Sequence, residues 1–331
     1  MNIYEQQTSN RRKTWLVMLA FVGFFLVLGL GFDAFYIGAG GGFVPIGSVL
    51  ALGVGSVSAA TSYFSGDRAV LLATAARPVE ELEAAATDAD KLTLRRLENV
   101  VDEMAIAAGL PRPKVYVVPD ADPNAFATGR DPAHASLAVT RGLLDTLDRE
   151  ELQGVVAHEM SHIRNLDVRV MTIVAALVGA VALLADWARR GMMWGGVRRR
   201  GNSSGDSGDD RGGGAASIIF FAVWLIVILI APLLSQLLAM MASRRREYLA
   251  DASGAELTRN PLGLARALEK IESAAGPTVA VNRGTAHLCI TDPLGRPMNL
   301  KEGAWANLFA SHPPMSARIA ALQEMAFQGR S

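Results

Sequence analysis

The sequence predicts an α+β protein, mostly helical, that combines one folded domain outside the membrane with about four hydrophobic membrane helices. Half of its 331 residues are hydrophobic, 19% are charged and the mean hydropathy is +0.24, a balance typical of chains with membrane segments. Long apolar runs, and short strand-like runs ahead of an amphipathic helix, are the other two observations. The formal net charge is zero, so the composition offers no basic face for a nucleic-acid partner.

The number of cysteines limits which disulfide or metal sites the chain can form. The chain has one cysteine, Cys289, which rules out a disulfide framework and a zinc cluster built from cysteines. It lies in the short apolar run Leu288–Ile290, and we expect it to be a small buried side chain.

Residues 1–66 are predicted to form a cytoplasmic tail followed by a transmembrane hairpin. The polar first residues end in the basic triplet Arg11–Lys13, and apolar runs follow at Trp15–Phe32 and Phe43–Phe64. Each run is long enough to cross a bilayer as a helix. Basic residues flank the outer ends of both runs, so the positive-inside rule places those ends in the cytoplasm.

Residues 67–169 are predicted to form the first part of the folded domain. Val79–Ala108 is expected to be a helix that Gly109 ends, and its apolar stripe includes Leu92 and Leu97. Short β-type runs and a helical turn follow at Lys114–Val118, Asn124–Gly129, Ala135–Thr140 and Arg141–Leu147. A few strands followed by a long helix predict an α+β arrangement.

Residues 170–242 carry the third and fourth apolar runs, Val168–Ala185 and Ile218–Met241, joined by a loop rich in Gly, Ser and Arg. Two further membrane crossings are the preferred interpretation, because both runs are long and almost uncharged. That topology puts the arginines of the loop on the outer side, against the positive-inside bias. The alternative is a hydrophobic hairpin that packs on the folded domain or lies in the membrane interface. Either arrangement returns the chain to the cytoplasmic side at Ser243.

Residues 243–331 are predicted to form the second part of the folded domain. Helices are expected at Arg244–Thr258, Pro261–Ala275 and Ser316–Phe327. The pair Asn260-Pro261 separates the first two, since proline is well tolerated in the first turn of a helix.

The most informative stretch of the chain is His158-Glu159-Met160-Ser161-His162. Histidines four residues apart lie on one face of a helix and can reach the same Zn²⁺. Glu159 is rotated off that face, where it can act on a water at the metal without binding the metal. This H-E-x-x-H arrangement is typical of metal-assisted peptide hydrolysis, and an N-cap at Asp148 supports the helix. The alternative is a surface helix that happens to carry two histidines.

A catalytic zinc takes three protein ligands, so a further residue must complete the site. Several candidates stay open on spacing alone: His134, His287, His312 and a carboxylate. The best carboxylates are Glu247 and Asp251, which lie four residues apart on one helix face. One can bind the metal while the other holds a ligand imidazole by its second nitrogen. The alternative is an ordinary helix with a solvated charged face.

Several motifs together resemble the HtpX-type membrane zinc endopeptidases, which belong to the same large family as the CAAX-prenyl endopeptidases. The resemblance covers nearly the whole chain and rests on the HEMSH helix, the apolar pair after it, and the segments RREYLAD, Thr285–Leu288 and Ser311–Pro314. It implies a zincin-like domain that binds one Zn²⁺ per chain, with Glu247 as third ligand and Asp251 orienting His158. The implied activity is endoproteolysis of damaged or misfolded membrane proteins at the cytoplasmic membrane of a bacterium or archaeon, with the active site facing the cytoplasm.

The mechanistic hypothesis assigns Glu159 as the general base that later returns its proton to the leaving amine. His312 is the candidate donor to the oxyanion, because the resemblance places its His-Pro-Pro segment near the cleft. A structural histidine that caps a turn before Pro313 is the alternative. Asp167 is expected to make local hydrogen bonds, and Arg318 to pair with a carboxylate near the site.

The run Asn124, Ala125, Phe126 and Ala127 is predicted to be an exposed edge strand. Such an edge can bind an extended polypeptide substrate by strand addition. The alternative is an ordinary strand of the sheet. Polypeptides and the lipid bilayer are therefore the expected partners.

Two other functions stay open. The first is a zinc-binding membrane scaffold or chaperone without turnover, although a pure binder has no need of a base such as Glu159 beside the metal. The second is a protease that processes lipid-modified C-termini, although four short apolar runs look too few for the membrane chamber that such a substrate needs.

Overall fold

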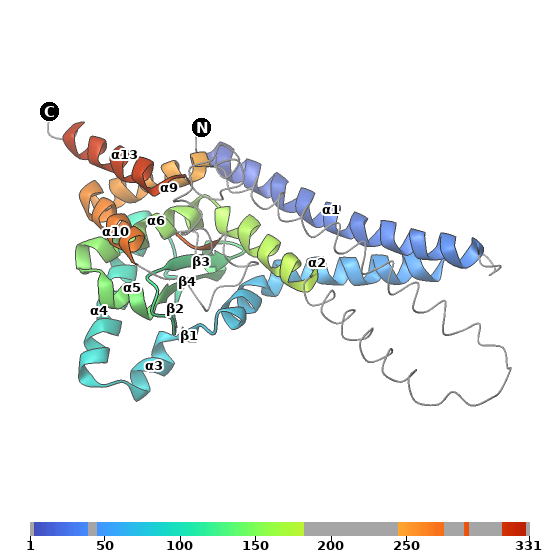
Figure 1. Ribbon diagram of the computed structural model, residues 1–331, viewed down its shortest axis with the longest axis horizontal. Coiled ribbons are helices and arrows are strands. Elements are labelled where there is room, and N and C mark those ends of the chain that lie inside the picture. The colour runs from blue at the N-terminus through green and yellow to red at the C-terminus, as the bar shows by residue number, and fades with distance from the viewer. Residues whose placement is uncertain (1–2, 39–44, 182–243, 275–287, 291–312, 329–331) are drawn as a thin grey trace, which may run out of the picture. The chain divides into compact units, whose positions relative to one another are not determined.

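A computed structural model describes residues 3–38, 45–181, 244–274, 288–290 and 313–328 (Figure 1). These residues divide into two compact units. The first unit contains 3–15, 62–176 and all described residues from 244 onward, and the second contains 16–38, 45–61 and 177–181.

The first unit contains a small mixed sheet. Its strands are β1 (Arg77–Pro78), β2 (Lys114–Val118), β3 (Ala125–Gly129) and β4 (Ala135–Thr140), in the order β1-β2-β4-β3. The strands β2 and β4 are parallel, with Val115 opposite Leu137, whereas β3 and β4 are antiparallel. The three predicted strands are confirmed. The strand β1 was not predicted; its residues Arg77 and Pro78 pair antiparallel with β2.

The described residues of this unit include the helices α3 (Val79–Ala85), α4 (Asp88–Ala108), α5 (Arg141–Thr146), α6 (Arg149–Arg164), α9 (Arg244–Thr258), α10 (Pro261–Ser273) and α13 (Met315–Gln328). The single helix predicted from Val79 to Ala108 is wrong. It is divided at Thr87, whose side chain caps α4 by accepting the Asp90 N–H at 3.3 Å. Gly109 ends α4 in the left-handed region, as predicted. Leu92 is exposed and Leu94 takes its place in the buried face.

The helix α6 is the centre of the first unit and packs against α4, α9, α10 and β3. Its start is fixed by a capping box, in which Asp148 and Glu151 each bind the other's backbone N–H at 3.0 and 2.9 Å. Leu152, Val155 and Met160 are completely buried. The α6 helix is therefore held on several sides, which fixes the direction of every side chain it carries.

Two helices among the described residues are long and apolar enough to cross a membrane, α1 (Ile3–Gly38) and α2 (Ile46–Ala73). Only 17% and 22% of their most apolar windows are buried, so they are unlike the core helices of a globular domain. In the second unit the Asp33 carboxylate accepts the backbone N–H groups of Gly47 and Ser48 at 2.7 and 2.8 Å, which fixes the start of α2.

Of the four or so predicted membrane helices, two are supported among the described residues, α1 and α2. The structure describes the third run only up to residue 181. Its described part is helical, since residues 167–181 form a helix. The fourth run, at 218–241, lies outside the described residues. The polar tail predicted before Trp15 is also different in the structure, because α1 already begins at Ile3.

Candidate metal centre

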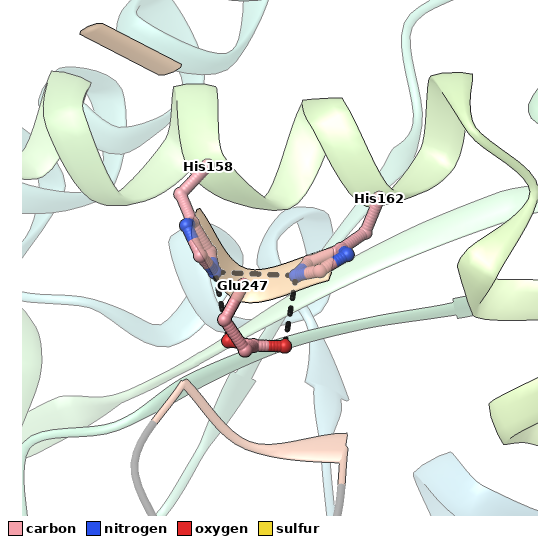
Figure 2. A group of neighbouring side chains, drawn as sticks. All are labelled: His158, His162 and Glu247. Atoms are coloured by element: carbon pink, nitrogen blue, oxygen red, sulfur yellow. Dashed lines mark hydrogen bonds and ion pairs between the residues drawn. The ribbon is translucent and has the colours of Figure 1, made fainter. Parts of the chain in front are cut away.

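The helices α6 and α9 bring His158, His162 and Glu247 together (Figure 2). One ligand atom from each lies within 4.8 Å of the others. The Nε2 atoms of the two histidines are 3.2 Å apart, and each is 3.7 Å from a carboxylate oxygen of Glu247. Among the described residues this is the only such group of metal-ligating side chains.

The distances fit a tetrahedral zinc site. Ligand atoms that bind one Zn²⁺ at about 2.0–2.1 Å in tetrahedral geometry are about 3.3 Å from each other, close to the 3.2 and 3.7 Å observed. The histidine tautomers support the same conclusion. Both Nδ1 atoms face carboxylates, so in the neutral imidazoles the protons are held there and both Nε2 lone pairs are directed at one place. A metal ion at that place can accept both lone pairs.

His158 is held by Asp251, which lies one turn after Glu247 on α9. Their Nδ1 and Oδ1 atoms are 2.9 Å apart. Asp251 in turn receives two hydrogen bonds from the fully buried Arg318 of α13, at 2.8 and 2.6 Å. Burial lowers the pKa of His158, and the Arg318 charge lowers it further against the opposing effect of Asp251. Although burial opposes it, the same guanidinium lowers the pKa of Asp251 to about 2.

His162 has a carboxylate of its own, Asp167, with Nδ1 and Oδ2 3.1 Å apart. The other oxygen of Asp167 accepts from the amide of Asn10 at 2.7 Å and that of Gln6 at 3.4 Å. A guanidinium nitrogen of Arg246 lies 3.5 Å from the same oxygen. Burial alone would lower the pKa of His162, but the hydrogen bond to Asp167 and the charge of Glu247 raise it to about 9.

Glu159 lies beside the three candidate ligands and is not one of the group. It is almost completely buried, and this burial raises the pKa of its carboxyl group to about 7. The backbone N–H of Ala127 on β3 donates a hydrogen bond to it. A carboxyl group with a pKa near neutrality can both accept and return a proton.

The site opens into a very small cavity. The cavity offers about 10 Å³ to the centre of a water molecule, and Ala127, Val168, Met171, Leu288, Cys289 and Ile290 complete its wall around Glu159 and the three ligands. That volume holds roughly one water or one ion, which suits a metal and excludes a peptide. The expected burial of Cys289 is confirmed.

The predicted substrate-binding run lies where strand addition requires it, but it is not exposed. Its residues Ala125, Phe126 and Ala127 belong to β3, the last strand of the sheet order, and Asn124 directly precedes it. All four are almost completely buried. The expectation of an exposed edge is wrong because α6 packs on β3 and the Ile290 N–H donates to the Ala125 carbonyl at 2.9 Å.

Of the other histidines considered as ligands, only His134 lies in the described part of the chain. It is exposed and pairs with Asp131 at 2.7 Å, so it is not part of the metal group. His287 and His312 lie outside the described residues. The predicted pairing of Arg318 with a carboxylate is present.

Sequence reasoning missed the support of His162. Asp167 was expected to make local bonds only, and Gln6 and Asn10 were placed in a polar tail. One signal could have shown them: Gln6 and Asn10 are four residues apart, hence on one helix face, directly before the first apolar run.

Comparison with known proteins adds three findings. Residues 91–326 match the model of peptidase family M48. A protein named "Protease HtpX homolog" from Streptococcus thermophilus is 42% identical over 98% of this chain and 100% of its own length, and one of the same name from Thermoanaerobacter pseudethanolicus is 40% identical over 98% of both chains. The crystal structure of S. mikatae Ste24p is similar with a TM-score of 0.47 and 16% identity, covering 96% of this chain and 67% of that one.

Proposed function

Since this chain belongs to peptidase family M48 and is an HtpX-type zinc metallopeptidase, we propose that it is a membrane-bound endopeptidase that removes damaged or misfolded proteins at the cytoplasmic face of the membrane. The observation that carries the proposal is the buried carboxyl of Glu159 beside the three converging ligand atoms of His158, His162 and Glu247. A site built only to hold a metal has no use for a fourth ionisable group there.

Different residues of the site have different roles in the reaction. His158, His162 and Glu247 would hold the ion, with Asp251 and Asp167 orienting the two imidazoles. Zinc bound there supplies a Lewis acid and makes water a better nucleophile. Glu159 takes the proton of the attacking water and delivers it to the leaving amine, since its raised pKa allows both transfers near neutral pH. Oxyanion stabilisation by His312 stays a prediction.

The outward edge of β3 is the proposed place for an extended substrate. The backbone groups of Ala125 and Ala127 point away from β4. The carbonyl of Ala125 accepts from Ile290, and the N–H of Ala127 donates to Glu159. A polypeptide that pairs at Ala125 must displace Ile290 from it, and the cavity must open beyond the volume it has here. Replacing Ile290 with proline removes this N–H, so we expect a lower KM for an unfolded substrate at unchanged zinc content. An unchanged or higher KM would argue against this binding edge.

The helices α1 and α2 support the proposed membrane location. Their apolar side chains are exposed in the structure, for example Trp15, Leu19, Val49 and Val57, and a bilayer would cover them. Basic residues lie before α1's apolar part and near the end of α2, which favours a cytoplasmic active site by the positive-inside rule. The crossings of the third and fourth apolar runs stay predictions, and cysteine accessibility across residues 189–214 tests them.

The test of the proposed function is peptidase activity of the full-length protein in detergent, after metal removal and after return of Zn²⁺. Wild type should regain cleavage of an unfolded protein, and Glu159→Gln should bind zinc but not cleave. Glu150→Gln is the matched control, because Glu150 lies on the same helix, is exposed and pairs with Arg266. Zinc binding without cleavage in the wild type would favour the scaffold alternative. Cleavage confined to prenylated peptides would favour processing of lipid-modified C-termini.

A further inference from the structure

We propose that the first turns of α1 are part of the zinc site, because Asn10, assisted by Gln6, positions Asp167 and through it the ligand His162. In this view the helix that leads into the apolar N-terminal segment is also a structural component of the metal centre. The inference rests on zinc binding by His158, His162 and Glu247, and it does not depend on which substrate is cleaved.

The contacts form a continuous line from α1 to the metal ligand. The amide nitrogen of Asn10 donates to Asp167 Oδ1 at 2.7 Å, and Asp167 Oδ2 lies 3.1 Å from Nδ1 of His162. Gln6, one turn earlier on the same face, adds a longer bond of 3.4 Å to the same oxygen. Asn10, Gln6 and Asp167 are all at most 2% exposed. Buried amides of this kind are costly unless they are hydrogen-bonded, so this arrangement requires α1 to be in place.

The same helix face also binds the end of α6. Gln7 donates to the carbonyl of Arg164 at 2.7 Å, and Asn10 donates to that of Asn165 at 2.9 Å. The next residue, Leu166, has a φ of 60°, a left-handed conformation that costs energy for a non-glycine residue. This strained turn carries the chain from His162 back to Asp167. Asn10 binds the Asn165 carbonyl before this turn and the Asp167 carboxylate after it, so its amide holds the turn in the form that brings this carboxylate to the imidazole.

Neutral donors suit this position. Asn10 and Gln6 fix the orientation of the Asp167 carboxylate without neutralising its charge, whereas an arginine in a bidentate pair would share it. The buried guanidinium of Arg246 forms a single, longer ion pair of 3.5 Å with the oxygen that Asn10 binds. An oriented carboxylate behind a ligand histidine fixes its tautomer and makes it a better ligand, and loss of such partners typically weakens metal binding. We therefore expect Asn10 to act on zinc affinity as a positioning residue, without touching metal or substrate.

The test is zinc affinity of the full-length protein in detergent, measured by competition with a chromophoric chelator, in a double-mutant cycle. Asp167→Ala should weaken zinc binding by about 10- to 100-fold, and Asn10→Ala by about threefold to tenfold. Asn10→Ala added to Asp167→Ala should have little further effect, because both substitutions break the same line of contacts. Gln6→Ala should cost less, since it removes only the longer bond.

Gln7→Ala is the matched control. It removes one amide of the same helix turn that binds α6 but does not touch Asp167, so its zinc affinity should stay within about twofold of the wild type. Metal-free thermal unfolding of each variant separates loss of affinity from loss of folding. Wild-type zinc affinity in Asn10→Ala would overturn the proposal. So would losses that multiply in the double variant, or an equal loss in Gln7→Ala. If the wild type bound no zinc, the metal site itself would be wrong, which is a different outcome.

Discussion

The two histidines that converge on the metal lie one turn apart on α6, yet opposite ends of the chain support them. His158 is held by Asp251, whose partner Arg318 comes from the last helix. His162 is held by Asp167, whose amide partners Asn10 and Gln6 come from the first helix. Each imidazole therefore has a buried carboxylate behind it, and the two carboxylates differ in what binds them.

That difference shows how the surroundings of identical ligands set their charge. Asp251 accepts two short hydrogen bonds from a buried guanidinium, whereas Asp167 accepts its hydrogen bonds from neutral amides and has the guanidinium of Arg246 only at 3.5 Å. The pKa of His158 is lowered, chiefly by burial and with help from Arg318, but the pKa of His162 is raised to about 9 despite burial. We call Asp251 with Arg318 the Arg318 side, and Asp167 with Asn10 and Gln6 the Asn10 side. Substitutions on the Arg318 side should chiefly lower folding stability, and those on the Asn10 side should chiefly lower zinc affinity.

The largest expected effect is a loss of folding stability when the charge of Arg318 is removed. Arg318→Met leaves the carboxylates of Asp251 and Glu247 buried without their cation, so the free energy of unfolding should fall by about 3–5 kcal/mol. Denaturant unfolding of the full-length protein measures this. Arg318→Lys should recover part of the loss, because it keeps the charge without the bidentate geometry. A methionine variant as stable as the wild type would contradict the account.

The second prediction compares the two carboxylates directly. Asp251→Asn and Asp167→Asn should each weaken zinc binding by about 10- to 100-fold. Asp251→Asn should lower the melting temperature of the metal-free protein more than Asp167→Asn, since it removes the carboxylate that accepts two hydrogen bonds from the fully buried Arg318, whereas Arg246 lies 3.5 Å from Asp167. Chelator competition and thermal unfolding measure the two effects. Equal loss of stability in both variants would remove the distinction between the two sides.

The third prediction concerns pH. Because the pKa of His162 is about 9 without metal, this residue carries a proton at pH 7.5 that zinc must displace. Zinc affinity should therefore rise by about tenfold per pH unit between pH 7.5 and 8.5, a range in which Glu159, with a pKa of about 7, is mostly ionised. Asp167→Asn should flatten this dependence. An affinity independent of pH in the wild type would show that His162 is already neutral.

The smallest effect is expected from an arginine outside the site. Arg112 pairs with Glu98 and Asp102, but its side chain is 39% exposed, so solvent screens both pairs. Arg112→Ala should cost at most about 1 kcal/mol and leave zinc affinity unchanged. If Arg112→Ala lowered the free energy of unfolding as much as Arg318→Met, burial would not explain why Arg318 contributes so much to stability.

Local patterns in the sequence predicted the parts of the site that depend on one helix. The four-residue spacing of His158 and His162 and the cap at Asp148 follow from helix geometry. The spacing of Glu247 and Asp251 made them candidates, and the family resemblance assigned Glu247 to the metal and Asp251 to His158. The support of His162 could not be predicted in this way. Asp167 reaches its histidine only through the strained turn at Leu166, and Asn10 reaches Asp167 across 157 positions of the chain.

The fold shows the same limit. The strands β2, β3 and β4 were predicted from short apolar runs, but the burial of β3 depends on contacts from α6 and Ile290 that lie far away in the sequence. The break of the long helix at Thr87 was missed because its hydrophobic spacing continues across the break. Local capping by a threonine side chain outweighed that pattern.

The most direct test of the central claim is the zinc X-ray absorption spectrum of the full-length protein loaded with one equivalent of Zn²⁺, beside Glu247→Ala. The account predicts two imidazoles and only nitrogen or oxygen neighbours at about 2.0–2.2 Å, with much weaker zinc retention in the variant. A sulfur neighbour at about 2.3 Å would contradict it, because Cys289 in the cavity wall would then be a ligand. Unchanged zinc binding in Glu247→Ala would contradict it equally.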